Sequence, residues 1–168
     1  SALENALRTD QEPLRRLHAL CTLDGAATIR PELLSIATRD RHPGVRRQAL
    51  RIAARWETDI SDLMTMTDDP DPTVRLQLAS TLGNFDGSLA GRGLAKVGMT
   101  STNRFTTSSV LSSLNKTNVG IVFSESLRLV DVKTPGKSAD EDRVRRIDFL
   151  SEVLVQVAAM GNDQQVAD

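Results

Sequence analysis

The sequence has few of the residues from which aromatic cores, disulfides and metal sites are built. It contains one cysteine, one tryptophan, no tyrosine and two histidines, and aromatic residues make up only 3% of the chain. The single cysteine, Cys21, excludes an internal disulfide framework and any cysteine-based zinc site. β-Sandwiches and barrels usually contain more aromatic and β-branched residues. The 39% of apolar residues, mostly Ala and Leu, instead favours one domain of closely packed helices.

Charge and hydropathy argue against two further classes of partner, nucleic acid and membranes. The net charge is -1, so no global field draws the chain toward nucleic acid or a membrane surface. No stretch of 18 apolar residues occurs, and we therefore expect no membrane insertion. The charge is nevertheless uneven, because residues 1–56 hold ten Lys or Arg against six Asp or Glu, and the rest holds eleven against sixteen.

An internal repeat organises the first half of the chain. An Asp, a Pro three residues later and an Arg three residues after that recur as Asp10, Pro13 and Arg16, as Asp40, Pro43 and Arg46, and as Asp69, Pro72 and Arg75. The prolines are 30 and 29 residues apart. Proline fits the first turn of a helix, where its missing N–H would have no partner, and Asp71 before Pro72 is suited to cap that helix. Apolar residues follow at helical spacing.

The repeat predicts a chain of helix pairs. The expected pairs are 2–9 with 13–23, 30–39 with 44–56, 60–67 with 73–84, 89–97 with 105–114, and 119–130 with 143–160. One pair cannot bury its own apolar face, but stacked pairs can. We therefore predict a single all-α domain over residues 1–168, an α-solenoid or superhelix of about five two-helix repeats. Gly91 and Gly93 should weaken their helix by about 1 kcal/mol each relative to Ala.

Two further expectations concern the organisation of the chain. The segment 131–142 is polar and has no periodicity, and we interpret it as an inserted loop. The helical pattern already includes the residues next to Ser1, and the residues just before Asp168 resemble the start of another unit, so we expect the domain to be a fragment of a larger multidomain protein.

The recurring Asp and Arg are too regular to be random surface charges. We predict that they form a structural ladder in which charge-assisted hydrogen bonds bridge neighbouring repeats. The residues of this ladder are Asp10, Arg16, Asp40, Arg46, Asp69 and Arg75. If it exists, replacing Arg75 with Ala should measurably lower the melting temperature.

The register D-x-x-P-x-V-R resembles HEAT repeats of the short, about 30-residue type. The ordered succession of segments 17–25, 42–50, 68–83 and 108–113 is similar to the HEAT region of planctomycete-type membrane-bound dehydrogenases with c-type haem-binding domains. The resemblance covers residues 10–160. It implies a scaffold between a dehydrogenase-like β-propeller and a cytochrome domain, in an extracytoplasmic or periplasmic protein. Cys21 departs from the family, which more often has Trp at this position.

The resemblance does not imply a cofactor within this segment. No Cys-x-x-Cys-His occurs, so the haem of such a family would lie outside it. We accordingly expect no catalytic, cofactor-binding or metal-binding residue here, and expect redox chemistry, if any, from flanking domains. Those domains, or another protein, are the expected partners; the oligomeric state is left open.

Individual candidate sites favour structural interpretations. His18 and His42 occupy different positions in their repeats, whereas a metal site needs several convergent ligands. Ser108, Ser109, Ser112 and Ser113 have no nucleophile elbow around them, and their small size favours close helix packing.

A row of three arginines leaves alternatives open. Arg47, Arg51 and Arg55 are four residues apart on one predicted helix, where like charges repel slightly, so they should face water, an acidic protein partner or a phosphate backbone. A solvated face is the default interpretation, and a protein-docking surface is the next. The alternative functions are a stand-alone adaptor and a HEAT-like DNA-binding protein of the DNA glycosylase type. The low net charge and the single Trp make nucleic acid the less favoured partner.

Overall fold

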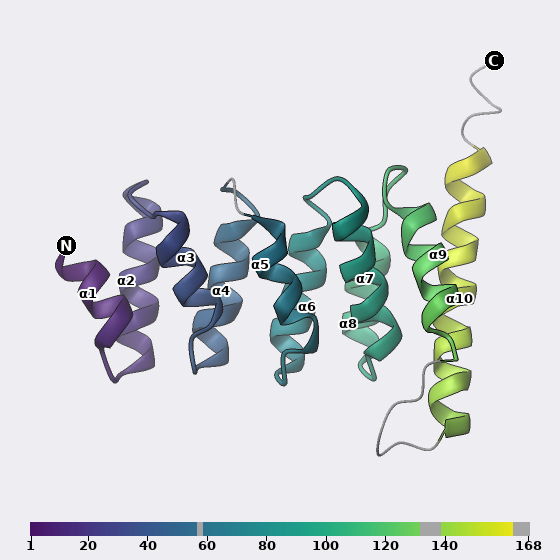
Figure 1. Cartoon of the computed structure of the whole chain (residues 1–168), viewed down its shortest axis with the longest axis horizontal. Coiled ribbons are helices and arrows are strands. Elements are labelled where there is room, and N and C mark those ends of the chain that lie inside the picture. Colours follow the sequence, from purple (N-terminus) through teal and green to yellow (C-terminus); the bar gives the residue numbers. More distant parts are fainter. Residues whose placement is uncertain (57–58, 132–138, 163–168) are drawn as a thin grey trace.

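The computed structural model describes residues 1–56, 59–131 and 139–162, and these residues form ten α-helices and one short 3-10 helix. The helices occur in sequential pairs stacked side by side along one long axis (Figure 1). The pairs are α1 (Ala2–Thr9) with α2 (Pro13–Gly25), α3 (Pro31–Thr38) with α4 (Pro43–Ala53), α5 (Ile60–Met64) and η1 (Thr65–Asp68) with α6 (Pro72–Leu82), α7 (Ser88–Thr100) with α8 (Arg104–Ser112), and α9 (Val119–Leu129) with α10 (Ala139–Asn162). The predicted all-α solenoid of about five two-helix repeats is confirmed.

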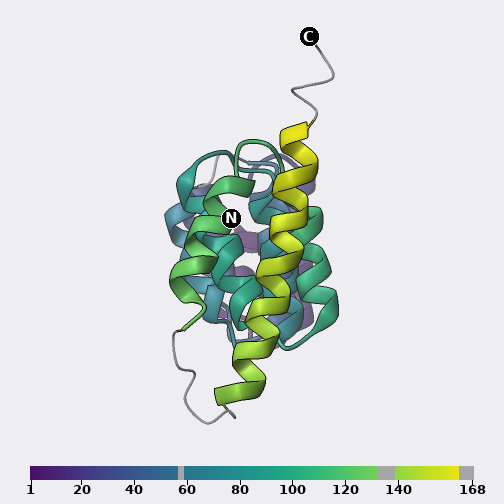
Figure 2. The ribbon, with the colours of Figure 1, turned by 90° about the vertical axis from the view of Figure 1, so that its right-hand side faces the viewer.

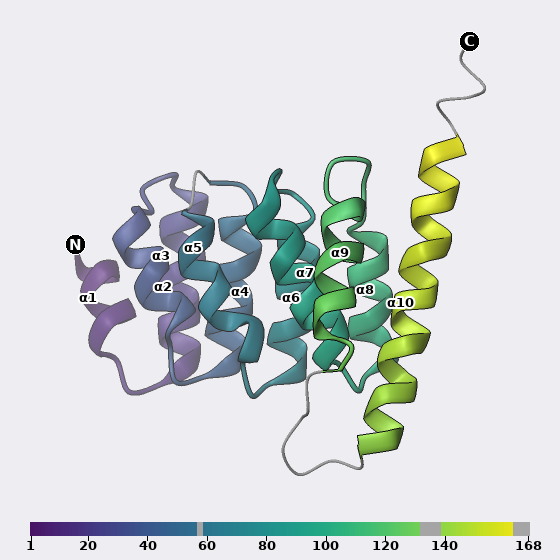
Figure 3. The same ribbon diagram turned by 45° about the vertical axis from the view of Figure 1, so that its right-hand side comes forward.

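The helices form two layers. The odd layer contains α1, α3, α5, η1, α7 and α9, and the even layer contains α2, α4, α6, α8 and α10 (Figures 1 and 3). One continuous core lies between the layers, and fully buried leucines from successive repeats, such as Leu20, Leu50 and Leu78, contribute to it. Each repeat therefore buries its apolar face against its neighbours, as stacking requires.

Local signals at the helix ends explain why the pairs begin where they do. Proline occupies the first turn of α2, α3, α4 and α6. Asp71 caps α6, because its side chain accepts a hydrogen bond from the Thr73 N–H at 2.8 Å. His42 does the same for α4 through Nδ1, which accepts from the Gly44 N–H at 3.1 Å. This capping contact is the structural role of His42.

The glycines of α7 permit close packing at a cost in helix propensity. A Cβ on Gly91 would lie 2.8 Å from an Ile121 methyl carbon, and a Cβ on Gly98 would lie 2.2 Å from Cζ of Phe149. Real Cβ atoms do not approach other atoms so closely. The expected loss of helix propensity therefore has a structural counterpart, because the missing side chains leave space for the neighbouring residues.

The predicted inserted loop has a different C-terminal boundary in the structure. Residues 132–138 lie outside the described residues, but Ala139 to Asp142 form the first turn of α10. Asp140, Glu141 and Asp142 are acidic, and negative charge is stabilised at a helix N-terminus. The same residues that gave the segment its polar, loop-like composition therefore favour the start of this helix.

α10 is the longest helix, and it extends beyond its neighbours at both ends (Figures 1 and 3). In the described parts of the chain, no helix is both long and apolar enough to cross a bilayer.

Candidate functional site: the inter-repeat ladder and the arginine face

The structure brings the recurring Asp and Arg residues of consecutive repeats together. Arg16 on α2 donates to both carboxylate oxygens of Asp40, from Nε at 2.6 Å and from Nη2 at 2.7 Å. Arg46 on α4 donates to Asp69 in the same way, at 2.7 and 2.8 Å. Such bidentate pairs fix both the distance and the relative orientation of the two groups.

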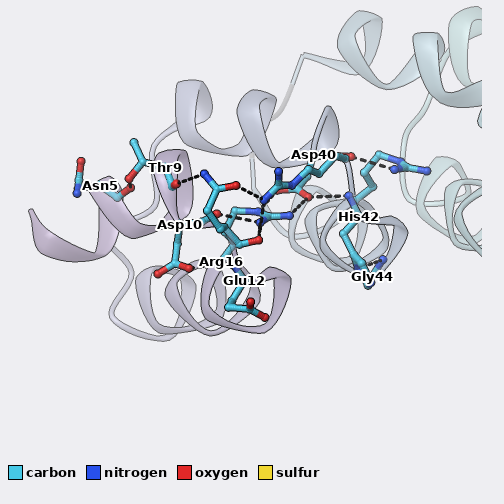
Figure 4. A network of polar contacts seen from close by, with 11 residues as sticks. Asn5, Thr9, Asp10, Glu12, Arg16, Asp40, His42 and Gly44 are labelled. Atoms are coloured by element: carbon cyan, nitrogen blue, oxygen red, sulfur yellow. Dashed lines mark hydrogen bonds and ion pairs between the residues drawn. The ribbon is translucent and has the colours of Figure 1, made fainter.

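The same arginines also bind their own repeat. Arg16 donates from Nη1 to the Asp10 carbonyl oxygen at 2.9 Å, and Arg46 donates to the Asp40 carbonyl oxygen at 2.9 Å. Each aspartate in turn accepts a backbone N–H two residues further on, as Asp40 does from His42 at 2.8 Å. Figure 4 shows this network around Arg16 and Asp40. Each rung thus connects the turn of one repeat, the helix that follows it and the turn of the next repeat.

The pairs are buried, and burial determines their electrostatics. The exposed fraction is 4% for the Arg16 side chain and 8% for that of Asp40. Burial raises the pKa of Asp40, but hydrogen bonds from Arg16 and the His42 N–H, with the charge of Arg16, outweigh it and hold that pKa below its usual value. The hydrogen bonds that Arg46 donates to the Asp69 carboxylate raise the pKa of Arg46 above its usual value. Both groups therefore stay ionised at neutral pH.

The register changes at the fourth repeat. Arg75 donates to the Asp69 carbonyl oxygen, but it forms no ion pair with any residue in 1–56, 59–131 or 139–162. Ser101 occupies the place of the next aspartate, and its hydroxyl accepts the Asn103 N–H at 3.1 Å. Thr107 occupies the place of the next arginine.

An arginine from a different helix contacts the same turn. Arg145 on α10 donates to the Ser101 carbonyl oxygen and, at 2.9 Å, to the Met99 carbonyl oxygen. In the earlier repeats the arginine of the Asp-Pro-Arg motif donates to the equivalent carbonyl oxygen, and in the fourth repeat Arg145 takes over this contact. Sequence reasoning missed this residue, because it lies outside the Asp-Pro-Arg register and no spacing connects it to Ser101.

Of the three arginines considered as a possible partner-binding row, Arg47 and Arg51 lie on the exposed side of α4, whereas Arg55 lies in the turn that follows this helix. Arg47 and Arg51 are exposed and form no hydrogen bond or ion pair with any residue that the structure describes. Arg55 is different, because it pairs with Asp24 of the preceding repeat. Asp24 also accepts a hydrogen bond from Nε1 of Trp56 at 2.9 Å. The row therefore contains two free cations and one inter-repeat contact.

The remaining candidates lie apart from one another. His18 and Cys21 are exposed on α2, and His42 caps α4. Ser109 on α8 donates to the Leu76 carbonyl oxygen at 3.1 Å, and Ser113 at the end of α8 packs against Gly83, so both contacts join α6 to α8. Within the described residues, no group of three or more His, Cys, Asp or Glu side chains converges as a metal site would.

The difference between Arg46 and Arg75 can be measured directly. Arg46→Ala leaves the carboxylate of Asp69, which is 6% exposed, without its cation, and we expect a loss of about 3 kcal/mol in the free energy of unfolding. Arg75→Ala removes a hydrogen bond to one carbonyl and should cost about half as much. Arg47→Ala, at an exposed position on the same helix as Arg46, is the control and should change stability by less than about 0.5 kcal/mol. Urea unfolding of the three variants gives the order, and equal losses for Arg46→Ala and Arg75→Ala would contradict it.

The lowered pKa of Asp40 gives a prediction with a definite sign. A carboxyl group whose pKa is lower in the folded chain contributes stability above its unfolded pKa, near pH 3.9, and loses that contribution as the pH falls through the folded value. We expect Asp40→Asn to be destabilised at pH 7, with the difference from the unsubstituted chain shrinking below about pH 4. Asp62→Asn, at the exposed Arg39 pair, is the control and should have little effect at any pH. An Asp40→Asn deficit that persisted unchanged at pH 3 would show that the carboxylate charge is not its cause.

Comparison with known proteins identifies the family to which the chain belongs. The family model for HEAT repeats matches residues 30–115, just over half of the chain. This range contains the Arg46–Asp69 pair and both free arginines of α4. No curated protein and no solved structure matches the chain. The family match and the stacked helix pairs together show that the chain belongs to the HEAT repeat family.

Proposed function

We propose that this HEAT module is a non-catalytic scaffold whose even layer docks an acidic segment of a partner protein. HEAT repeats generally mediate protein interactions and are generally non-catalytic. The observation that carries the proposal is the charge of three consecutive even-layer helices. The helices α4, α6 and α8 contain five arginines and no Asp or Glu. Two of these arginines, Arg46 and Arg75, bind turns within the stack, whereas Arg47 and Arg51 face solvent.

The odd layer differs from the even layer in how its surface charges are paired. Several of its basic side chains pair across repeats, as Arg30 does with Glu4 at 2.6 Å, Arg39 with Asp62 at 3.1 Å, and Arg92 with Glu125 at 3.4 Å. These exposed pairs contribute little stability individually, but they neutralise the surface. An acidic partner would therefore be attracted to the even layer rather than to the odd layer.

A polar groove continues the arginine face toward the C-terminal repeats. A hollow of about 370 Å³ lies between α6 and α8 and is lined by Ser80, Asn84, Ser109, Ser112, Ser113 and Asn115, among others. Its hydroxyl and amide groups can donate to and accept from a peptide backbone. A segment crossing α4, α6 and α8 would thus meet guanidinium groups at one end and neutral polar groups at the other.

The finer form of the proposal concerns the parent polypeptide. In this form the partner is a flanking domain, and the module holds a dehydrogenase-like propeller and a c-type cytochrome domain together in an extracytoplasmic protein, with no cofactor of its own. Its support is the resemblance of the ordered segments between residues 17 and 113. A native polypeptide much heavier than 18.3 kDa with a haem Soret band is the expected result, and a colourless protein of about that mass would contradict it.

The docking surface is tested by charge reversal. We expect a fluorescein-labelled polyglutamate peptide to bind the chain at low salt, with binding measured by fluorescence anisotropy. Arg47→Glu with Arg51→Glu should weaken this binding by about tenfold or more, because two favourable contacts become repulsive. Arg8→Glu with Arg128→Glu changes the net charge equally on exposed odd-layer positions and is the matched control.

Two outcomes would contradict the docking surface. Equal weakening by both double variants would show that only net charge matters. Tighter binding of a DNA duplex in the same assay, with a steep salt dependence that Arg47 and Arg51 control, would favour a nucleic-acid partner instead.

A further inference from the structure

A second hollow continues the surface of the even layer beyond α8. α10 closes the C-terminal end of the stack, where it contacts α8 as well as α9 (Figure 2). A hollow of about 310 Å³ lies between the first half of α8 and the middle of α10. Its lining includes Arg104 and Ser108 from α8, and Asp148, Phe149 and Glu152 from α10. We call it the end hollow.

The end hollow lies on the same side of the stack as the free arginines of α4. Thr107 occupies the place of the motif arginine, so the next residue, Ser108, corresponds to Arg47 two repeats earlier. The side chains of Ser108 and Arg47 are both exposed. A partner segment that crosses α4, α6 and α8 therefore reaches the end hollow next.

The charges at the end hollow are opposite in sign to those on α4. Asp148 and Glu152 are four residues apart on α10, so both carboxylates lie on the side of this helix that faces α8. Both side chains are exposed, and neither forms an ion pair or a hydrogen bond with any residue in 1–56, 59–131 or 139–162. Like charges at this spacing repel slightly, so a cation between them is stabilised.

The arginine in the lining does not neutralise these carboxylates. The guanidinium of Arg104 lies over the ring of Phe105, 4.8 Å from the ring centre, where the cation is attracted to the face of the ring. Among the residues that the structure describes, Arg104 has no ion-pair partner. The carboxylates of Asp148 and Glu152 are therefore available to a cation from outside the chain.

We infer that the acidic partner segment carries an arginine beyond its acidic part, and that the side chain of this arginine enters the end hollow. The inference rests on the proposed function, because it assigns the chemistry of the other end of the same segment. A guanidinium has five donors, which suit two carboxylates and the hydroxyl of Ser108. Phe149 gives the lining an apolar part, against which the stem of an arginine can pack. The volume is at the lower end of ligand sites and suits a single side chain.

The spacing of the helices sets the length of such a segment. Packed helices are about 8–10 Å apart, and three such steps separate α4 from α10 along the even layer, about 24–30 Å in total. An extended chain covers about 3.3 Å per residue. About seven to nine residues therefore separate the acidic part of the segment from its arginine.

Fluorescence anisotropy with two labelled, C-terminally amidated peptides tests the inference. Both peptides contain six glutamates followed by eight Gly or Ser residues, and one ends in Arg and the other in Gln. At low salt the Arg peptide should bind about threefold or more tightly, although its net negative charge is smaller, because it adds an ion pair. Asp148→Asn with Glu152→Gln should abolish this difference. Glu12→Gln with Glu32→Gln changes the net charge equally at exposed positions of the first two repeats, and this matched control should keep the difference.

The outcomes separate this inference from the proposed function. Equal affinities of the two peptides, with binding that still depends on Arg47 and Arg51, would overturn the inference and leave the docking surface intact. A preference for the Arg peptide that persisted in the Asp148→Asn, Glu152→Gln variant would also overturn it, because another surface would then bind the arginine. Binding of neither peptide would contradict the docking surface and the inference together. Circular dichroism confirms that the variants remain folded.

Discussion

The bidentate contact between an arginine of one repeat and an aspartate of the next sets the geometry on which the remaining packing depends. A planar guanidinium that binds both oxygens of a carboxylate fixes a separation and an angle, and it does so between the same two motif positions in successive repeats. Because these side chains are buried, the pairing is also obligatory: either partner left alone would be an uncompensated buried charge. The apolar residues of the core then pack within a spacing that the ladder defines.

The contacts that join neighbouring repeats change along the length of the stack. The first three repeats use the Asp-Pro-Arg register, whereas Ser101 and Thr107 interrupt it in the fourth. From there, close contacts at glycines of α7 bring the odd-layer helices and α10 together, and Arg145 reaches back to the turn before α8. This division leaves the arginine face of the even layer in the regular half of the stack.

Short-range patterns in the sequence were sufficient to predict the helix pairs. They were less informative about the segments and contacts between the pairs. The prolines, the cap at Asp71 and the Asp-Arg register act within a few residues or at a fixed repeat distance, and they predict the solenoid. The start of α10 at Ala139 was missed because acidic residues are compatible with either a loop or a helix N-terminus. The pairing of Asp24 with Arg55 and Trp56, and the reach of Arg145 to Ser101, depend on tertiary contacts that leave no spacing in the sequence.

The coupling between consecutive repeats is measured most directly by a double-mutant cycle on Arg46 and Asp69. The free energies of unfolding of Arg46→Ala, Asp69→Ala and the double variant, each obtained from urea titrations at pH 7, give the interaction energy between the two side chains. We predict a coupling of about 2 kcal/mol or more, with the double variant little worse than either single variant. A coupling near zero, with the two losses simply adding, would contradict the claim that this pair joins one repeat to the next.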